Sequence, residues 1–119
     1  MSFENSIVWQ KSRQLVHAIY DMVQLLPDSE RFGLTPQICR AATSVMANIA
    51  EGWGRESRRD KAHFLAIAQG SLDELRSHLI VCCDRRWFDR KQIAPVFSLM
   101  TEIGRMLTVI RRKFRNSSG

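Results

Sequence analysis

Apolar residues near the C-terminus recur at alternating spacings of three and four residues without a break. The run consists of Ile93, Val96, Met100, Ile103, Leu107, Ile110 and Phe114. Such spacing keeps apolar side chains on one face of an α-helix through about three heptads. Asp89, followed three residues later by Gln92, can cap this helix at its start. The pattern predicts an amphipathic helix over residues 90–114 that must bury one face against other helices.

Three earlier segments carry similar apolar stripes, and no segment shows the strict alternation typical of a half-buried strand. Their spacings predict helices over residues 6–26, 36–52 and 58–84. With short connections between them, the four helices predict an all-α fold, a single up-down-up-down four-helix bundle. The expected core residues are Leu15, Ile19, Ile38, Val45, Leu65, Leu72, Leu75, Leu79, Ile103 and Leu107.

Local signals place the ends of the second helix. Thr35 is the expected N-cap, with Pro36 in the first helical position, where its missing N–H costs nothing. Gly52 or Gly54 is expected to supply the left-handed residue that ends the helix. The tail from about residue 116 to 119 is expected to be disordered.

Composition limits the broad class of the protein. The chain has 119 residues, enough for one core without support from metals or disulfides, so residues 1–119 are expected to form one domain. Cys39, Cys82 and Cys83 cannot all pair and have no zinc-type spacing, which indicates a reducing compartment. Polar residues interrupt each apolar stretch, and the start has no secretion signal. We expect a cytoplasmic protein with no membrane contact, metal site or cofactor.

Positive charge is concentrated in the last quarter of the chain. The formal net charge is +6, and residues 90–119 carry seven basic residues and one acidic residue, Glu102. Basic clusters of this kind attract nucleic-acid phosphates. The candidate nucleic-acid-binding residues are Arg90, Lys91, Arg105, Arg111, Arg112, Lys113 and Arg115. The alternative is a solvated basic face, since helix C-termini favour Lys and Arg through the helix dipole alone.

Two glycines inside predicted helices indicate close packing, because glycine destabilises a helix by about 1 kcal/mol relative to alanine. These are Gly70 and Gly104. An antiparallel turn near Arg55 would place Gly70 beside Arg40, and Asp73 and Glu74 within a turn of it. That arrangement predicts an interhelical ion pair to Arg40, or alternatively a solvated surface pair that contributes less than about 1 kcal/mol.

Asn48 and Glu51 lie three residues apart on one helix face, a spacing that could suggest catalysis. We instead interpret them as partners of the polar backbone near the end of the second helix and the start of the third, with Arg55, Arg58 or Arg59 as charge partners.

Five segments together resemble a known family. They are VW at residues 8–9, PDSERFGL at 27–34, QICRAA at 37–42, SVMANIAEG at 44–52 and FLAIAQGSLDEL at 64–75. These segments resemble the four-helix bundle proteins encoded in intervening sequences of bacterial 23S ribosomal RNA genes, also labelled S23. The resemblance covers about residues 3–110. The structural motif positions within it are Arg40, Asn48, Glu51, Gly52, Gly70, Ser71 and Glu74. The sequence departs from the family at Met46, often proline there, and at Trp53.

The resemblance implies a cytosolic bacterial bundle that assembles as a homopentamer. More distant members are the accessory proteins of diversity-generating retroelements, pentamers thought to bind nucleic acid and a reverse transcriptase. Apolar residues off the main stripes, namely Val16, Val23, Phe97 and Val109, are consistent with a second contact between copies.

We therefore expect a non-enzymatic homo-oligomeric scaffold whose basic surface binds RNA or DNA and that can also bind a protein partner. Two alternatives stay open: a helical RNase using Arg58 and His63, and a purely structural assembly. This pair matches an Arg-x4–6-His pattern, and with three histidines and 14 arginines in 119 residues about one such match is expected by chance. His78 and Cys82 could share a metal, but two ligands do not make a site.

Overall fold

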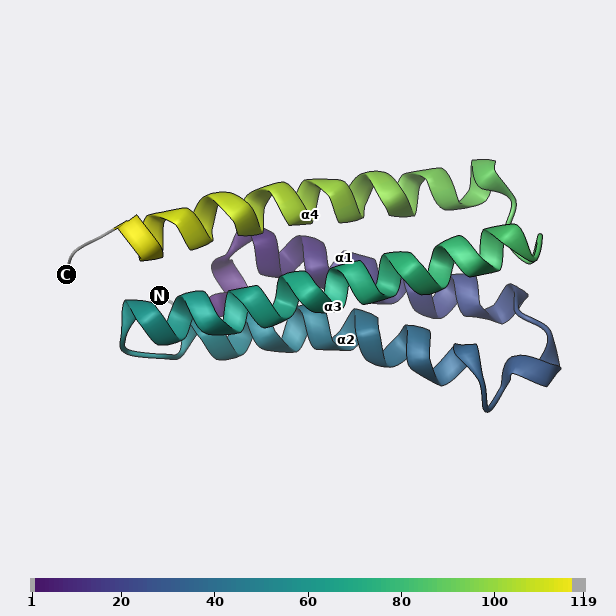
Figure 1. Cartoon of the computed structure of the whole chain (residues 1–119), viewed down its shortest axis with the longest axis horizontal. Helices are drawn as coiled ribbons and strands as arrows, with labels where there is room; N and C mark the ends of the chain where they lie inside the picture. The colour runs from purple at the N-terminus through teal and green to yellow at the C-terminus, as the bar shows by residue number, and fades with distance from the viewer. Residues whose placement is uncertain (1, 117–119) are drawn as a thin grey trace.

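The computed structural model describes residues 2–116 as four helices arranged up, down, up and down (Figure 1). They are α1 (Ile7–Met22), α2 (Leu34–Trp53), α3 (Arg58–Asp84) and α4 (Arg90–Asn116). Short 3-10 helices at Phe3–Asn5, Val23–Leu25 and Asp28–Glu30 flank α1 and join it to α2. The molecule is a rod of 50 × 24 × 21 Å. The predicted all-α bundle is confirmed. Most of the predicted tail lies outside the described residues, while Asn116 still belongs to α4.

The core lies along the axis of the rod. All ten predicted core residues are buried, and eight of them are completely so. The α4 stripe from Ile93 to Leu107 is buried, whereas Ile110 and Phe114 are half-buried at its end. Each helix is therefore held by the apolar stripe that predicted it.

By length and composition alone, α4 could also cross a membrane. An 18-residue window within Arg90–Arg115 has a mean hydropathy of 1.4, and 28% of that window is buried. A core helix of a globular protein meets the same criteria. Because Ile93, Met100 and Leu107 are almost fully buried in the bundle, we assign α4 to the core.

The predicted start of the second helix is wrong by two residues. The helix begins at Leu34, and the Glu30 carboxylate accepts a hydrogen bond from the Leu34 backbone N–H at 3.1 Å. Gly33, rather than Thr35, occupies the N-cap position. Pro36 is tolerated in the first turn because N–H groups there need no partner within the helix.

The predicted left-handed glycine at the end of α2 is also wrong. Gly54 has φ −83°, and no glycine among residues 2–116 has a positive φ. Gly52 serves another purpose, since an added Cβ would lie 3.2 Å from Phe64 Cβ and 3.3 Å from the Lys61 carbonyl oxygen. The glycine allows α2 and α3 to approach each other closely there. The left-handed residue of the described chain is Arg86, with φ 61°, in the turn after α3.

The starts of α3 and α4 have side-chain caps. Ser57 Oγ accepts a hydrogen bond from Asp60 N at 3.0 Å. At α4, Lys91 N donates to Asp89 Oδ1 at 3.0 Å, and Asp89 N donates to Gln92 Oε1 at 3.3 Å. The reciprocal cap predicted for α4 is thus confirmed.

Two of the four off-stripe apolar residues belong to the core. Val16 and Val23 are each only 7% exposed, so they offer no second contact surface. Val16 is buried because α1 packs against both α2 and α4, and Val23 lies in the 3-10 helix that directly continues α1. Val109 is half-exposed and Phe97 half-buried, and the exposed apolar residues of α3 are Ile67, Ile80 and Val81.

Candidate functional site

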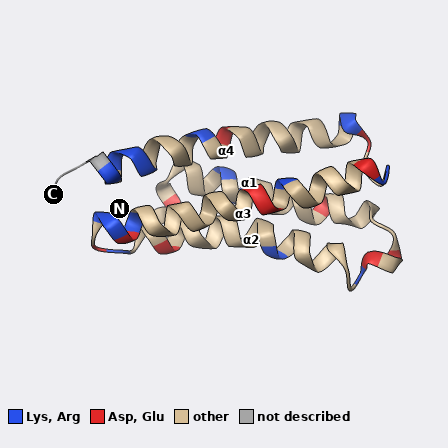
Figure 2. Cartoon of the chain, in the orientation of Figure 1, with Lys and Arg blue, Asp and Glu red and all other residues tan. Residues whose placement is uncertain are grey.

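The seven basic residues singled out in the sequence do not form one surface. Arg111, Arg112, Lys113 and Arg115 lie at the C-terminal end of α4, whereas Arg90 and Lys91 lie at its start (Figure 2). Twenty residues separate Lys91 from Arg111, which corresponds to about 30 Å of helix. Arg105 is exposed between them. A single compact contact can therefore use only one of the two groups.

The end of α4 lies beside the start of α3, which brings in basic residues that the sequence analysis did not select. Gln69 on α3 bonds to Thr108 on α4 at 2.8 Å, and the two helices run antiparallel (Figure 1). Continuing this register sets residues 62–66 level with residues 111–115, so the first turn of α3 lies about one turn farther along the rod. We define the basic end as Arg55, Arg58, Arg59, Lys61, Arg111, Arg112, Lys113 and Arg115. The segments that supply it, residues 51–61 and 111–115, carry eight basic residues and three carboxylates.

The opposite end of the rod has nearly balanced charge. It is formed by residues 28–31 and 84–91, which carry five basic residues and four carboxylates. We call these residues the far end. Arg90 and Lys91 belong to it. Because neighbouring carboxylates offset their charge, the potential there is weaker than at the basic end.

Lys61 ties the end of α2 to α3. Its ammonium group donates to the Trp53 carbonyl at 2.9 Å and to the Gly52 carbonyl at 3.4 Å, which satisfies helix-terminal acceptors of α2. Trp53, half-buried, packs against the core. These contacts fix the short connection that carries Arg55.

Arg55 is held in a fixed position over an aromatic ring. Its guanidinium carbon lies 4.5 Å from the centre of the Phe64 ring, and Nη2 lies 3.3 Å from Glu51 Oε2. This confirms Arg55 as the charge partner of Glu51. The exposed His63 ring meets Phe64 edge-on, with the ring centres 5.5 Å apart. Basic and aromatic groups are therefore adjacent at this end.

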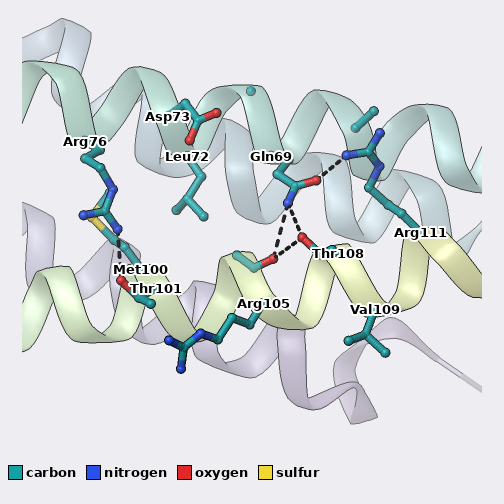
Figure 3. Close-up of a pocket in the computed structure, with 13 residues that line it drawn as sticks. Gln69, Leu72, Asp73, Arg76, Met100, Thr101, Arg105, Thr108, Val109 and Arg111 are labelled. Atoms are coloured by element: carbon teal, nitrogen blue, oxygen red, sulfur yellow. Dashed lines mark hydrogen bonds between the residues drawn. The ribbon is translucent and has the colours of Figure 1, made fainter.

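An open groove of about 860 Å³ runs between α3 and α4 (Figure 3). Gln69 crosses it at one end, donating to the Gly104 carbonyl at 3.3 Å and accepting a hydrogen bond from Arg111. Arg111 Nε is buried and has no hydrogen-bond partner within residues 2–116. At the other end, Arg76 donates to Thr101 Oγ1 at 3.2 Å. Because Gln69 holds Arg111 against the groove, this arginine is less free to meet a phosphate than Arg112.

The close packing predicted around Gly70 and Arg40 is wrong. An added Cβ on Gly70 would meet nothing within 4 Å, so this glycine opens the groove. An added Cβ on Gly104 would meet only the tip of Leu72, at 3.4 Å. Arg40 is exposed and forms no ion pair among residues 2–116, while Glu74 lies 3.4 Å from His78 on its own helix.

The reason lies in the register of α2 and α3. Ser44 and Ser71 share a hydrogen bond of 2.7 Å between their hydroxyl oxygens, which places Gly70 near Val45, about one turn beyond Arg40. Asn48 donates to the Ser44 carbonyl at 2.8 Å and to Ser44 Oγ at 3.1 Å. The Asn48 side chain thus forms its hydrogen bonds within the middle of α2, and its predicted role at the helix end is wrong.

The other candidate constellations are not assembled. Arg58 and His63 are both exposed, and no hydrogen bond joins them among the described residues. No group of three or more metal-ligating side chains occurs within residues 2–116. Cys82 is fully buried, and this burial, with smaller contributions from Cys83 and Glu30, raises the pKa of its thiol to about 11. A buried, protonated thiol is typical of a core position.

Comparisons with known proteins agree with the resemblance. Residues 4–109 match the 23S rRNA-intervening sequence protein family. A crystal structure of a protein with unknown function from the S23 ribosomal protein family of Bacteroides thetaiotaomicron VPI-5482 superposes with a TM-score of 0.83 at 28% identity. The alignment covers 89% of this chain and 99% of that one. Among curated proteins, no match was found.

Proposed function

This chain belongs to the 23S rRNA-intervening sequence protein family, and on that premise we propose that it is a non-enzymatic scaffold that binds RNA or DNA through its basic end. The observation that carries the proposal is the convergence of basic residues from α4, α3 and the α2–α3 connection at one end of the rod. Their eight positive side chains exceed the local carboxylates by five. Binding of this kind is electrostatic and weakly selective for sequence.

The far end provides a matched control for the test. R112Q/K113Q removes two charges from exposed positions of the basic end, and R90Q/K91Q removes two from exposed positions of the far end. Both variants have the same net charge, so a difference in affinity between them shows which end of the rod binds the oligonucleotide. Fluorescence anisotropy with a labelled oligonucleotide at 50 mM salt measures the affinity.

We expect R112Q/K113Q to weaken binding and R90Q/K91Q to bind like the parent. Each lost phosphate contact should also lower the slope of log K against log salt by about 0.7 to 0.9. Equal losses of affinity in the two variants would refute binding at the basic end. No binding by the parent at 50 mM salt would refute nucleic-acid binding altogether and favour the purely structural alternative.

Self-association is the second part of the proposal. Ile67, Ile80 and Val81 are between 39% and 48% exposed on α3, and burial of their apolar surface against another copy would favour association. A pentamer is the state implied by the family resemblance. Light scattering should then give five times the monomer mass of 13.8 kDa. A monomer mass at micromolar concentration would contradict this part alone.

A ring of copies would repeat the basic end in each subunit. Several weak phosphate contacts on one polyanion act together, so assembly strengthens binding without any new contact. The interaction of such an assembly with a further protein partner is also part of the scaffold proposal. If the protein partner binds a surface other than the basic end, R112Q/K113Q should bind that partner as tightly as the parent does.

A further inference from the structure

We propose that the basic end selects single-stranded nucleic acid, with a base stacking on the Arg55 guanidinium where it lies over Phe64. This inference rests on the proposed function and specifies its substrate class. The juxtaposition of a stacked arginine, an exposed histidine and a surplus of positive charge at one end of the rod carries it.

The Arg55 guanidinium is a preorganised planar surface. Its central carbon lies over the Phe64 ring, 4.5 Å from the ring centre, and Nη2 lies 3.3 Å from a Glu51 carboxylate oxygen. The side chain remains 43% exposed, so a ligand can still reach it. Because the ring and the carboxylate both restrict the side chain, a base that stacks there loses less freedom than one that must first order an unconstrained arginine.

A second ring lies next to this surface. His63 is exposed and meets Phe64 edge-on at 5.5 Å between ring centres. Bases of single strands stack on aromatic rings and on guanidinium planes alike. The two platforms, Arg55 on Phe64 and the adjacent His63, therefore offer positions for neighbouring bases of one strand.

The surrounding charge holds the backbone of such a strand. Arg58 and Arg59 lie in the first turn of α3, and Arg112, Lys113 and Arg115 lie on the neighbouring end of α4. A duplex can engage these charges through its phosphates, but its base faces are covered by stacking within the helix. Stacking on Arg55 therefore adds affinity only for a single strand, whereas the charges add affinity for both forms.

The test uses a variant that keeps the positive charge at this position and removes the planar guanidinium group. R55K retains a positive group at this position but has no guanidinium to stack. R31K makes the same exchange at the far end, where the exposed Arg31 guanidinium carbon lies 4.7 Å from the centre of the Phe32 ring, and serves as the matched control. Each protein is titrated with one labelled 12-nucleotide strand, once alone and once as a duplex with its complement.

We expect the parent to bind the single strand more tightly than the duplex. R55K should weaken single-strand binding by about fivefold or more, the range seen when one base stack is lost, and leave duplex binding unchanged. R31K, at the far end, should leave both unchanged. Thermal unfolding followed by circular dichroism confirms that both variants keep the parent fold.

The outcomes separate this inference from the proposed function. Equal affinity of the parent for the two forms, or single-strand binding unaffected by R55K, overturns the inference while basic-end binding stands. Loss of duplex and single-strand binding to the same extent in R55K also overturns it, because charge or local structure then explains the effect. No binding of either form overturns both claims.

Discussion

Gly70 and Gly52 should respond in opposite directions to the same substitution. Both lie inside helices, where alanine is favoured over glycine by about 1 kcal/mol through backbone entropy. At Gly70 a Cβ would meet nothing within 4 Å, so G70A should raise the free energy of unfolding by nearly this amount. For a domain of this size, about 1 kcal/mol corresponds to roughly 3–6 °C in Tm.

At Gly52 the new methyl group would lie too close to atoms of α3. It would lie 3.2 Å from Phe64 Cβ and 3.3 Å from the Lys61 carbonyl oxygen, two atoms that are held by the α3 backbone. Overpacking of this kind typically costs about 1–3 kcal/mol. After the helix-propensity gain is subtracted, G52A should lower the free energy of unfolding by up to about 2 kcal/mol.

Urea unfolding followed by circular dichroism at 222 nm measures both variants against the parent. Protein concentration is held constant, since an oligomer is stabilised by mass action. We expect the urea midpoint of G70A to be the highest, that of the parent to be intermediate and that of G52A to be the lowest. Destabilisation by G70A would show that the groove beside Gly70 is filled, and stabilisation by G52A would show that α2 and α3 are not closely packed there.

Three other predictions concern the core and the alternative function. Leu75→Ala at a fully buried position should cost about 2–5 kcal/mol in the same urea assay, and a smaller loss would contradict its place in the core. Burial raises the pKa of the Cys82 thiol from 9.0 to about 11, so the thiol loses its proton at a lower pH in the unfolded chain than in the folded protein. The contribution of this thiol to stability should thus be constant below pH 9 and be lost between pH 9 and 11, so C82A should reduce the fall in stability over that range; an identical fall in C82A would contradict the assignment. RNA incubated with the parent or with H63A should remain intact by gel electrophoresis, and cleavage that disappears in H63A would favour the nuclease alternative.

The fold could be predicted because it depends on patterns local to each helix. The unbroken spacing from Ile93 to Leu107 specifies one buried face, and any arrangement that hides four such faces in a short chain is a bundle. The cap formed by Asp89 and Gln92 is likewise a contact within one turn. The start of α2 was missed because Glu30, outside the helix, supplies the acceptor.

Interhelical register was not available from the sequence. The hydrogen bond between Ser44 and Ser71 sets α2 against α3 about one turn away from the register that a symmetric turn at Arg55 suggests. Gly70 consequently opens a groove instead of packing beside Arg40. Such offsets depend on how side chains interlock, and helical periodicity carries no information about them.

The basic end was only half predictable for the same reason. Arg112 and Lys113 stand in a conspicuous basic run, but Arg58 and Arg59 occur in a segment with Asp60 and Glu56 where the charge nearly cancels along the chain. Only the antiparallel contact of α3 with α4 brings the two groups to one end. The stacking of Arg55 on Phe64 similarly requires the close approach of α2 and α3 at Gly52.

The four lysines of the chain allow the most direct test of basic-end binding. Lys113 lies at the basic end and Lys91 at the far end, both exposed, while Lys11 is paired with Glu102 at 2.8 Å and Lys61 bonds to the Trp53 carbonyl. Acetylation of the intact protein, with and without a saturating oligonucleotide at 50 mM salt, is quantified at each lysine by mass spectrometry. We predict that the oligonucleotide protects Lys113 and leaves Lys91 as reactive as in the free protein. Protection of Lys91 alone, or equal protection of both lysines, would contradict binding at the basic end.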